Sequence, residues 1–181
     1  MEYIDVLDKN GNKTGIVKSK NQVYEDGDYH KSVHIWIIND NNEILVQKRA
    51  ANKETFAGLW AISVAGHVRS GETSLDALKR EMKEELGQKL QDENIKFLFT
   101  VKREQEYKSH KLNVIDDVYL VHLNLDVENT KLQFSELSDI KYVYYEYLER
   151  IFKNNDSEYV PYTEEHKKLF EILHKMLDKK S

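Results

Sequence analysis

Cysteine is absent from this chain of 181 residues. Without cysteine the protein has no disulfide, no thiolate zinc site and no cysteine nucleophile. Proline occurs once, at Pro161, and glycine seven times, so no linker rich in these residues divides the chain. No apolar run approaches the roughly 20 residues of a membrane-spanning helix, and no secretory signal pattern stands at the N-terminus. We therefore expect a cytoplasmic protein without membrane contacts.

Positive charge is in deficit, since 27 lysine and arginine residues face 32 aspartate and glutamate residues, for a net charge of −5. This balance argues against binding to a nucleic-acid polymer, which favours a basic face. A small phosphorylated partner remains compatible, because a bound metal reverses the local field. The length suits a single domain over residues 1–181. The sequence leaves open whether the protein forms a homodimer.

Hydrophobic patterning predicts a small hairpin followed by a mixture of strands and helices. Residues 3–7 and 14–18 form the hairpin around an Asn-Gly turn, within an N-terminal extension over residues 1–28. Further strands are expected over 32–39, 43–49, 60–65, 95–101, 118–124 and 142–145, and helices over 73–86, 146–152 and 163–177. The irregular order of strands and helices favours an α+β fold, with helices on both faces of a mixed sheet.

The segment 66–88 (GHVRSGETSLDALKREMKEELGQ) carries the strongest chemical pattern. Its helical part places Glu81, Glu84 and Glu85 on one arc beside an apolar stripe. Glu81 faces Glu85 at the i,i+4 spacing, a like-charge pair that is destabilising by itself. A hard cation such as Mg²⁺, which prefers oxygen ligands, would relieve the repulsion. The alternative interpretation is an ordinary solvated helix face.

The same segment resembles the Nudix box, G-x5-E-x7-R-E-U-x-E-E-x-G-U, in which U is a bulky apolar residue. All seven fixed positions match, namely Gly66, Glu72, Arg80, Glu81, Glu84, Glu85 and Gly87. Met82 suits the first U position. Gln88 departs at the last one, which serves packing after the helix and so casts little doubt on catalysis.

The resemblance implies a Nudix α/β/α sandwich with a central mixed sheet. It implies Mg²⁺ or Mn²⁺ held by Glu81, Glu84 and Glu85, often joined by the backbone carbonyl of Ala65. By the same resemblance, Arg80 orients the glutamates. The implied function is a Nudix pyrophosphohydrolase, which uses water to cleave a diphosphate linkage in a nucleoside diphosphate derivative or similar small molecule.

The flanking segments 29–39 and 47–60, together with residues 65–67, resemble Nudix proteins related to type I isopentenyl diphosphate isomerase. Ala65 replaces the cysteine that performs protonation in that isomerase. His30 and His67 match two of its metal-binding histidines, whereas Val23 replaces a third. An isomerase-like protein is therefore one alternative. The other is a non-catalytic Nudix-fold binding module, which a loss of box carboxylates would favour, and none is lost.

Several residues outside the glutamate arc are candidate substrate contacts. Lys48, Arg49 and Lys53 form a basic group that either is solvated or holds substrate phosphate. Phe56 and Trp60 either stack on a substrate ring or belong to the core. The expected substrate-binding residues are Lys48, Arg49, Phe56 and His67.

Histidines and carboxylates elsewhere have competing interpretations. His30, His34 and His67 are each structural residues in the ordinary case, and His67 is the favoured exception because it lies inside the box. Glu72 is either a general base or a structural carboxylate against the helix dipole. Residues 104–117 are expected to form a loop over the metal, and they offer Asp116 and Asp117 as well as Glu104 and Glu106, which are favoured for their longer reach. The expected catalytic set is Glu72, Arg80, Glu84, Glu104 and Glu106.

Overall fold

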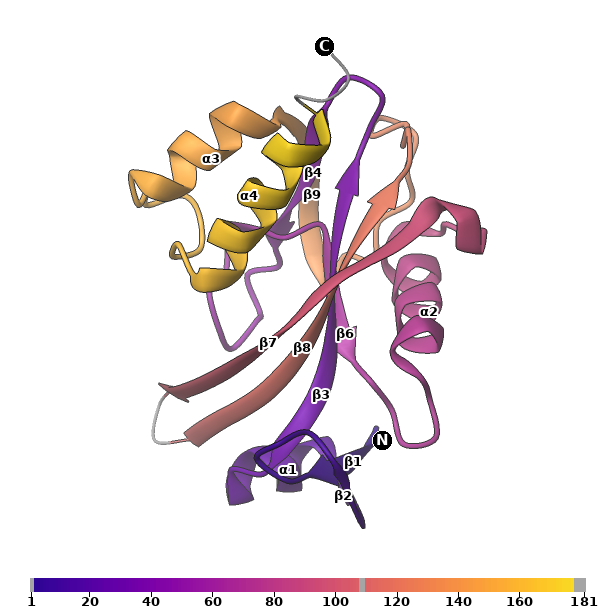
Figure 1. Cartoon of the computed structure of the whole chain (residues 1–181), viewed down its shortest axis with the longest axis vertical. Coiled ribbons are helices and arrows are strands. Elements are labelled where there is room, and N and C mark those ends of the chain that lie inside the picture. Colours follow the sequence, from indigo (N-terminus) through magenta and orange to yellow (C-terminus); the bar gives the residue numbers. More distant parts are fainter. Residues whose placement is uncertain (1, 108–109, 178–181) are drawn as a thin grey trace.

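The computed structural model describes residues 2–107 and 110–177, and its main feature is a mixed sheet built around β3 (Figure 1). β3 pairs in parallel with β8 along its length, and on its other side it pairs antiparallel with β6 and then β4. β7 pairs with β8, while β5 and β9 pair with β4. The strands are β1 (Tyr3–Leu7), β2 (Lys13–Ser19), β3 (Tyr29–Ile38), β4 (Glu43–Arg49), β5 (Trp60–Ala61), β6 (Val64–His67), β7 (Ile95–Tyr107), β8 (His110–His122) and β9 (Leu137–Tyr144).

Helices cover both faces of this sheet because the side chains of β3 alternate between them. Val33, Ile35 and Ile37 belong to the core beneath α2, whereas Trp36 and Ile38 belong to the core beneath α3 and α4. Figure 1 shows α2 on one side of the strands and α3 with α4 on the other. The α+β sandwich expected from the sequence is confirmed. The helices are α1 (Lys20–Asp26), α2 (Ser74–Leu86), α3 (Tyr145–Lys153) and α4 (Glu164–Leu177), with a 3-10 turn at Asp92–Asn94.

Helix α2 is delimited by its own sequence at both ends. The Thr73 side chain accepts the backbone N–H of Asp76, and the Asp76 carboxylate accepts that of Thr73, which forms a capping box. Gly87 ends the helix with a φ of +69°, a left-handed conformation in which glycine pays no steric penalty. Both ends agree with the predicted helix.

The N-terminal unit, defined here as residues 2–26 with β1, β2 and α1, contains the predicted hairpin and one helix that was not predicted. The Ser19 side chain caps α1, and Val23 packs with Ile4 and Val6 in a small separate core. β1 reaches the main sheet through the pairing of Leu7 with Tyr29. No helix among the described residues is long and apolar enough to cross a membrane.

Two sequence predictions were wrong in detail. The strand expected over residues 60–65 is split, because buried Ser63 donates its hydroxyl to the Leu45 carbonyl and accepts the Ile37 N–H. The loop expected over residues 104–117 is the far part of the β7–β8 hairpin. β8 is hydrogen-bonded there on both edges, to β3 and to β7, and this pairing of distant segments has no local sequence signal.

Candidate active site

Arg80 lies at the centre of the motif that the sequence singled out. Its Nε and Nη2 donate to the two oxygens of Glu72 at 2.7 and 3.0 Å, a two-pronged ion pair. Glu72 also accepts the backbone N–H of Arg69 at 3.0 Å. Although partial burial raises it, the pKa of Glu72 is lowered on balance by these hydrogen bonds from Arg80 and Arg69. Glu72 therefore has a structural use as the ion-pair partner of Arg80. The sequence had suggested a different structural use, an interaction with the helix dipole.

The same guanidinium connects strand β6 to helix α2. Nη1 donates to Glu81 and, at 3.3 Å, to Glu84, while Nη2 donates to the backbone carbonyl of His67 at 2.8 Å. Burial opposes the charge of Arg80, but its hydrogen bonds to Glu72 and Glu81 raise its pKa. Arg80 thus stays charged and in contact with two of the three expected metal ligands.

Gly66 allows Glu81 to lie directly against β6. A Cβ atom at residue 66 would stand 2.1 Å from Glu81 Oε1, which is impossible without displacing the carboxylate. The requirement here is close approach, since Gly66 does not have a positive φ. The glycine at the start of the motif and the glutamate 15 residues later therefore form one structural feature.

Glu81 and Glu85 are buried on the sheet side of α2, whereas the Glu84 side chain is 41% exposed. Burial raises the pKa of Glu81, and burial together with the charges of Glu81 and Glu136 raises that of Glu85 well above its ordinary value. Glu85 Oε2 is buried without a hydrogen-bond partner among the described residues. An unpaired buried carboxylate oxygen is costly, and a divalent cation would satisfy it. The donor set therefore fits a hard metal ion.

Two of the expected phosphate-binding residues approach this arc. The charges of Lys53 and Arg49 both act to lower the pKa of Glu85. Arg49 is held by the Thr55 carbonyl at 2.9 Å, and Lys53 pairs with Glu136. Burial lowers the pKa of Arg49, against the charges of Glu136 and Glu85. Cationic side chains thus border the buried carboxylates.

The other candidates around Arg49 divide between the loop and the core. Lys48 turns toward the Trp60 ring, with Nζ 5.7 Å from its centre. Trp60 is buried, so its interpretation as a core residue is confirmed. Phe56 is 40% exposed, with a φ of +52° that is uncommon outside glycine. Phe56 is thus accessible to a ligand.

His67, inside the motif, contacts the N-terminal unit. Its Nε2 is 2.6 Å from the Tyr24 hydroxyl, and its ring centre is 5.5 Å from that of His30. Burial raises the pKa of Tyr24 to about 12, and burial together with the charges of Lys20 and His30 lowers that of His67 well below its ordinary value. Tyr24 and His67 thus share a buried hydrogen bond that joins α1 to β6. His30 Nε2 is buried without a hydrogen-bond partner among the described residues.

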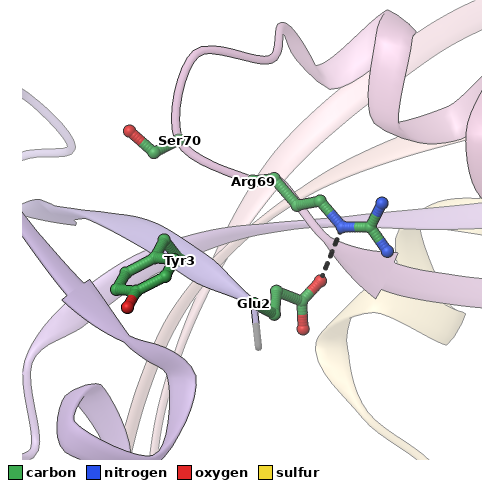
Figure 2. Close-up of a pocket in the computed structure, with 4 residues that line it drawn as sticks. All are labelled: Glu2, Tyr3, Arg69 and Ser70. Atoms are coloured by element: carbon green, nitrogen blue, oxygen red, sulfur yellow. Dashed lines mark hydrogen bonds and ion pairs between the residues drawn. The ribbon is translucent and has the colours of Figure 1, made fainter.

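Arg69, which follows β6, lies between two carboxylates. Its Nε is 3.2 Å from Glu2 Oε1, and its Nη2 is 3.5 Å from Glu84 Oε2. Figure 2 shows Glu2 and Arg69 pointing toward each other in a surface pocket that Tyr3 and Ser70 also line. Glu2, Tyr24 and Arg69 were not expected from the sequence to be site residues. The position of Arg69 inside the motif was the one available signal.

The family assignment follows from comparison with known proteins. The family model described as the NUDIX domain matches residues 28–163. The chain belongs to the Nudix family. It is 40% identical to Nudix hydrolase 3 of Arabidopsis thaliana over 95% of its own length, but it spans 23% of that longer protein. It is 31% identical to an uncharacterised Nudix hydrolase of Listeria innocua, with 90% of each chain covered.

Two further comparisons support the fold and the narrower resemblance. A crystal structure of a Deinococcus radiodurans protein superposes with a TM-score of 0.70 over 97% of this chain and 99% of that one, at 18% identity. An isopentenyl-diphosphate Delta-isomerase of Photorhabdus laumondii is 34% identical over 60% of this chain and 61% of its own. The chain is thus an enzyme of the Nudix hydrolase family that also resembles the isomerases in part.

A second cluster of ionisable groups lies on the opposite face of the sheet from the Nudix helix. His34, Asp116 and Glu165 are the one group among the described residues that brings three histidine or carboxylate ligand atoms within 4.8 Å of one another. His34 Nδ1 is 2.7 Å from Glu165, and Asp116 accepts two hydrogen bonds from Arg103. Burial opposes ionisation, but His34 and Arg103 lower the pKa of Asp116 to about 2. Arg103 thus pairs with Asp116, and His34 lies between Asp116 and Glu165.

The remaining candidate bases are held by other partners. Exposed Glu104 accepts hydrogen bonds from Tyr29 and, at 2.6 Å, from Lys102, and exposed Glu106 follows it on β7. Asp117 accepts from Lys31 at 2.9 Å and Thr100 at 2.8 Å. Within the described residues, no hydrogen bond or ion pair links these carboxylates to the box glutamates. The choice of base stays a prediction.

Proposed function

We propose that this chain is a pyrophosphohydrolase that uses Mg²⁺ or Mn²⁺ to cleave a diphosphate linkage in a nucleoside diphosphate derivative or similar small molecule. The observation that carries the proposal is the buried pair Glu81 and Glu85. Both side chains have a raised pKa, and one oxygen of Glu85 has no hydrogen-bond partner among the residues that the structure describes. Such an arrangement is costly alone and favourable around a divalent cation.

In this proposal Glu81, Glu84 and Glu85, with the carbonyl of Ala65, would hold the metal. The metal would supply charge neutralisation on the phosphate oxygens and a lower pKa for bound water. Arg80 keeps two of these carboxylates in place through its hydrogen bonds to Glu81 and Glu84. This role of Arg80 explains why the motif contains an arginine together with its acidic neighbours.

Substrate contacts are proposed on either side of this arc. Arg49 and Lys53, which act electrostatically on Glu85, would meet the phosphates. Exposed Phe56 would stack on a substrate ring, and His67 would contact the substrate from β6. Lys48 is the weakest member of the proposed set, because its ammonium group turns toward Trp60.

The general base is proposed among Glu104, Glu106 and Glu72, in that order. Glu72 ranks last because Arg80 binds both of its oxygens. Single replacement by glutamine, followed by kcat measured against pH, tests each one. The variant of the base loses rate together with the acidic limb of the profile. If all three variants keep that limb, and Asp116→Asn and Asp117→Asn keep it too, the metal alone activates the water and this part of the proposal is wrong.

The main test is a screen for diphosphate cleavage, with the phosphomonoester products separated by chromatography, over nucleoside diphosphates, sugar nucleotides, dinucleotides and isopentenyl diphosphate, with Mg²⁺ and with Mn²⁺. We expect hydrolysis within one nucleotide class and none without metal. Isomerisation of isopentenyl diphosphate is not expected, because Ala65 offers no proton and the chain has no cysteine. Interconversion of the two isomers without hydrolysis of any diphosphate would overturn the proposal.

A further inference from the structure

Arg69 stands where it competes with a cation for Glu84. Its guanidinium is shared between Glu2 and Glu84, at 3.2 and 3.5 Å. Glu84 also accepts from Arg80 at 3.3 Å, so two arginines already share its carboxylate. A divalent ion at Glu84 is repelled by any positive charge that stays beside that carboxylate. The position of Arg69 therefore bears on cation affinity.

Glu2 offers Arg69 an alternative partner, because it binds Nε whereas Glu84 binds Nη2. Figure 2 shows the Glu2 carboxylate facing the Nε edge of Arg69. The same carboxylate has its other oxygen 3.8 Å from His67 Nδ1, so its position is limited from two sides. Glu2 comes from outside the Nudix box and from the N-terminal unit.

Hydrogen bonds hold the segment around Glu2 and β1 against the Nudix box. The Ser70 N–H donates to the Tyr3 carbonyl at 2.8 Å, and the Ser70 hydroxyl donates to Asp5 at 2.7 Å. The Glu2 carbonyl accepts the Lys20 N–H at 3.0 Å, which ties it to α1. These hydrogen bonds hold the backbone next to both Glu2 and Arg69. The fold therefore fixes the position of this ion pair.

We propose that Glu2 is a positioning residue that draws the guanidinium of Arg69 away from Glu84 and so keeps Glu84 available to a divalent cation. This inference rests on the proposed metal site at Glu81, Glu84 and Glu85. Glu2 does not touch substrate or metal, and it acts through Arg69. The N-terminal unit is thereby a functional part of the active site.

The test measures direct binding of Mn²⁺ to the full chain. Electron paramagnetic resonance reports the bound Mn²⁺, and no substrate is present. Glu2→Gln raises the Mn²⁺ concentration at half-saturation about two- to five-fold, the range expected for a partly exposed ion pair. Glu25→Gln is the matched control, because it removes one negative charge from an exposed site on α1. Glu25→Gln leaves Mn²⁺ binding unchanged.

A double-mutant cycle separates positioning from the simple loss of a negative charge. If Glu2 acts through Arg69, Glu2→Gln weakens Mn²⁺ binding in the wild-type background and has no effect in the Arg69→Gln background. If Glu2 acts only by its field, Arg69→Gln tightens binding equally with and without Glu2, and that additive result overturns the proposal. Should Glu2→Gln fail to fold, Glu2→Asp takes its place, since it keeps the charge and shortens the reach.

Failure of this inference is distinguishable from failure of the proposed function. Glu84→Gln must weaken Mn²⁺ binding if the metal lies in the box. Wild-type binding that depends on Glu84 but not on Glu2 overturns the positioning role alone. Binding that depends on neither residue overturns the proposed metal site as well.

Discussion

At the scale of single residues, Glu84 offers the cleanest test of the metal site because its exposed side chain contributes little to packing. We expect Glu84→Gln to lower kcat by at least about 100-fold, since replacing even outer partners of metal ligands costs 10- to 100-fold. The thermal midpoint of the metal-free variant should match that of the wild type. Near-normal turnover by this variant would show that Glu84 is not a ligand.

Replacement of Gly66 should lower both the stability and the activity of the protein. Gly66→Ala places a methyl group 2.1 Å from Glu81 Oε1, so the carboxylate must leave its place against β6. We expect a loss of about 1–3 kcal/mol in the free energy of unfolding, as for other overpacked sites, and a strong loss of activity.

Gly15→Ala is the control for Gly66→Ala. Gly15 has a φ of +84° and nothing within 4 Å of its added Cβ. Its replacement strains the backbone but leaves activity intact. Denaturant titration and initial rates check both variants, and equal activity losses would contradict the steric explanation.

His34 makes stability depend on pH through its carboxylate neighbours. Burial lowers its pKa, but the charges of Asp116 and Glu165 raise it on balance above 6.5. The stabilisation is therefore complete below pH 6.5 and is lost as the pH rises through the folded-state pKa. We expect His34→Gln to destabilise the fold more at pH 6 than at pH 9. Urea titrations at the two pH values measure this, and a difference that grows with pH would refute it.

At the scale of elements, the capping box of α2 is a local device with a local effect. Thr73→Ala removes the hydroxyl that accepts the Asp76 N–H, and we expect a loss of about 1 kcal/mol in stability. The substitution lies two turns before Glu81, so kcat should change little. Thr73→Ser is the conservative control and should restore the cap. A fall in kcat as large as that of Glu84→Gln would place the helix start in the catalytic machinery.

Elements whose signals are contiguous in sequence were predictable, and elements defined by distant pairing were not. Helix α2 has its apolar stripe, its cap and its terminal glycine within 15 residues, and its ends were correctly predicted. The outer half of β8 is charged and looks like a loop, yet residues 113–117 pair with β3 and β7 together. Only the assembled sheet supplies the hydrogen bonds that make this segment a strand.

The same division applies to the candidate site. Arg80, Glu81 and Glu84 are neighbours in sequence, and the structure brings them into contact as the motif suggests. Glu2 and Tyr24 reach the site from the N-terminal unit, and no spacing in the sequence pointed to them. Glu104 and Glu106 were favoured for their reach within a stretch expected to be a loop, but both residues lie in β7.

At the scale of the whole molecule, metal binding and folding should be linked. A cation that binds only the folded state stabilises it by about 2.7 kcal/mol at a concentration of 100 times Kd. We expect the thermal midpoint to rise with Mg²⁺ concentration, because the cation relieves the buried pair Glu81 and Glu85. Glu85→Gln should melt with little dependence on Mg²⁺. Calorimetric scans over a Mg²⁺ series check this, and equal shifts in both proteins would exclude Glu85 as a ligand.

The contacts in and around the site also differ in the sequence separation of their partners. Arg80 and His67 are 13 residues apart, whereas Tyr24 and His67 are 43 apart. Ser32 and Asp116, on the central strands, are 84 apart, and His34 and Glu165 are 131 apart. Since loop closure costs more for distant partners, the β6–α2 unit can form early in folding while β3 and β8 pair late. A refolding chain would then assemble the glutamates of the Nudix box before the sheet that supports them is complete.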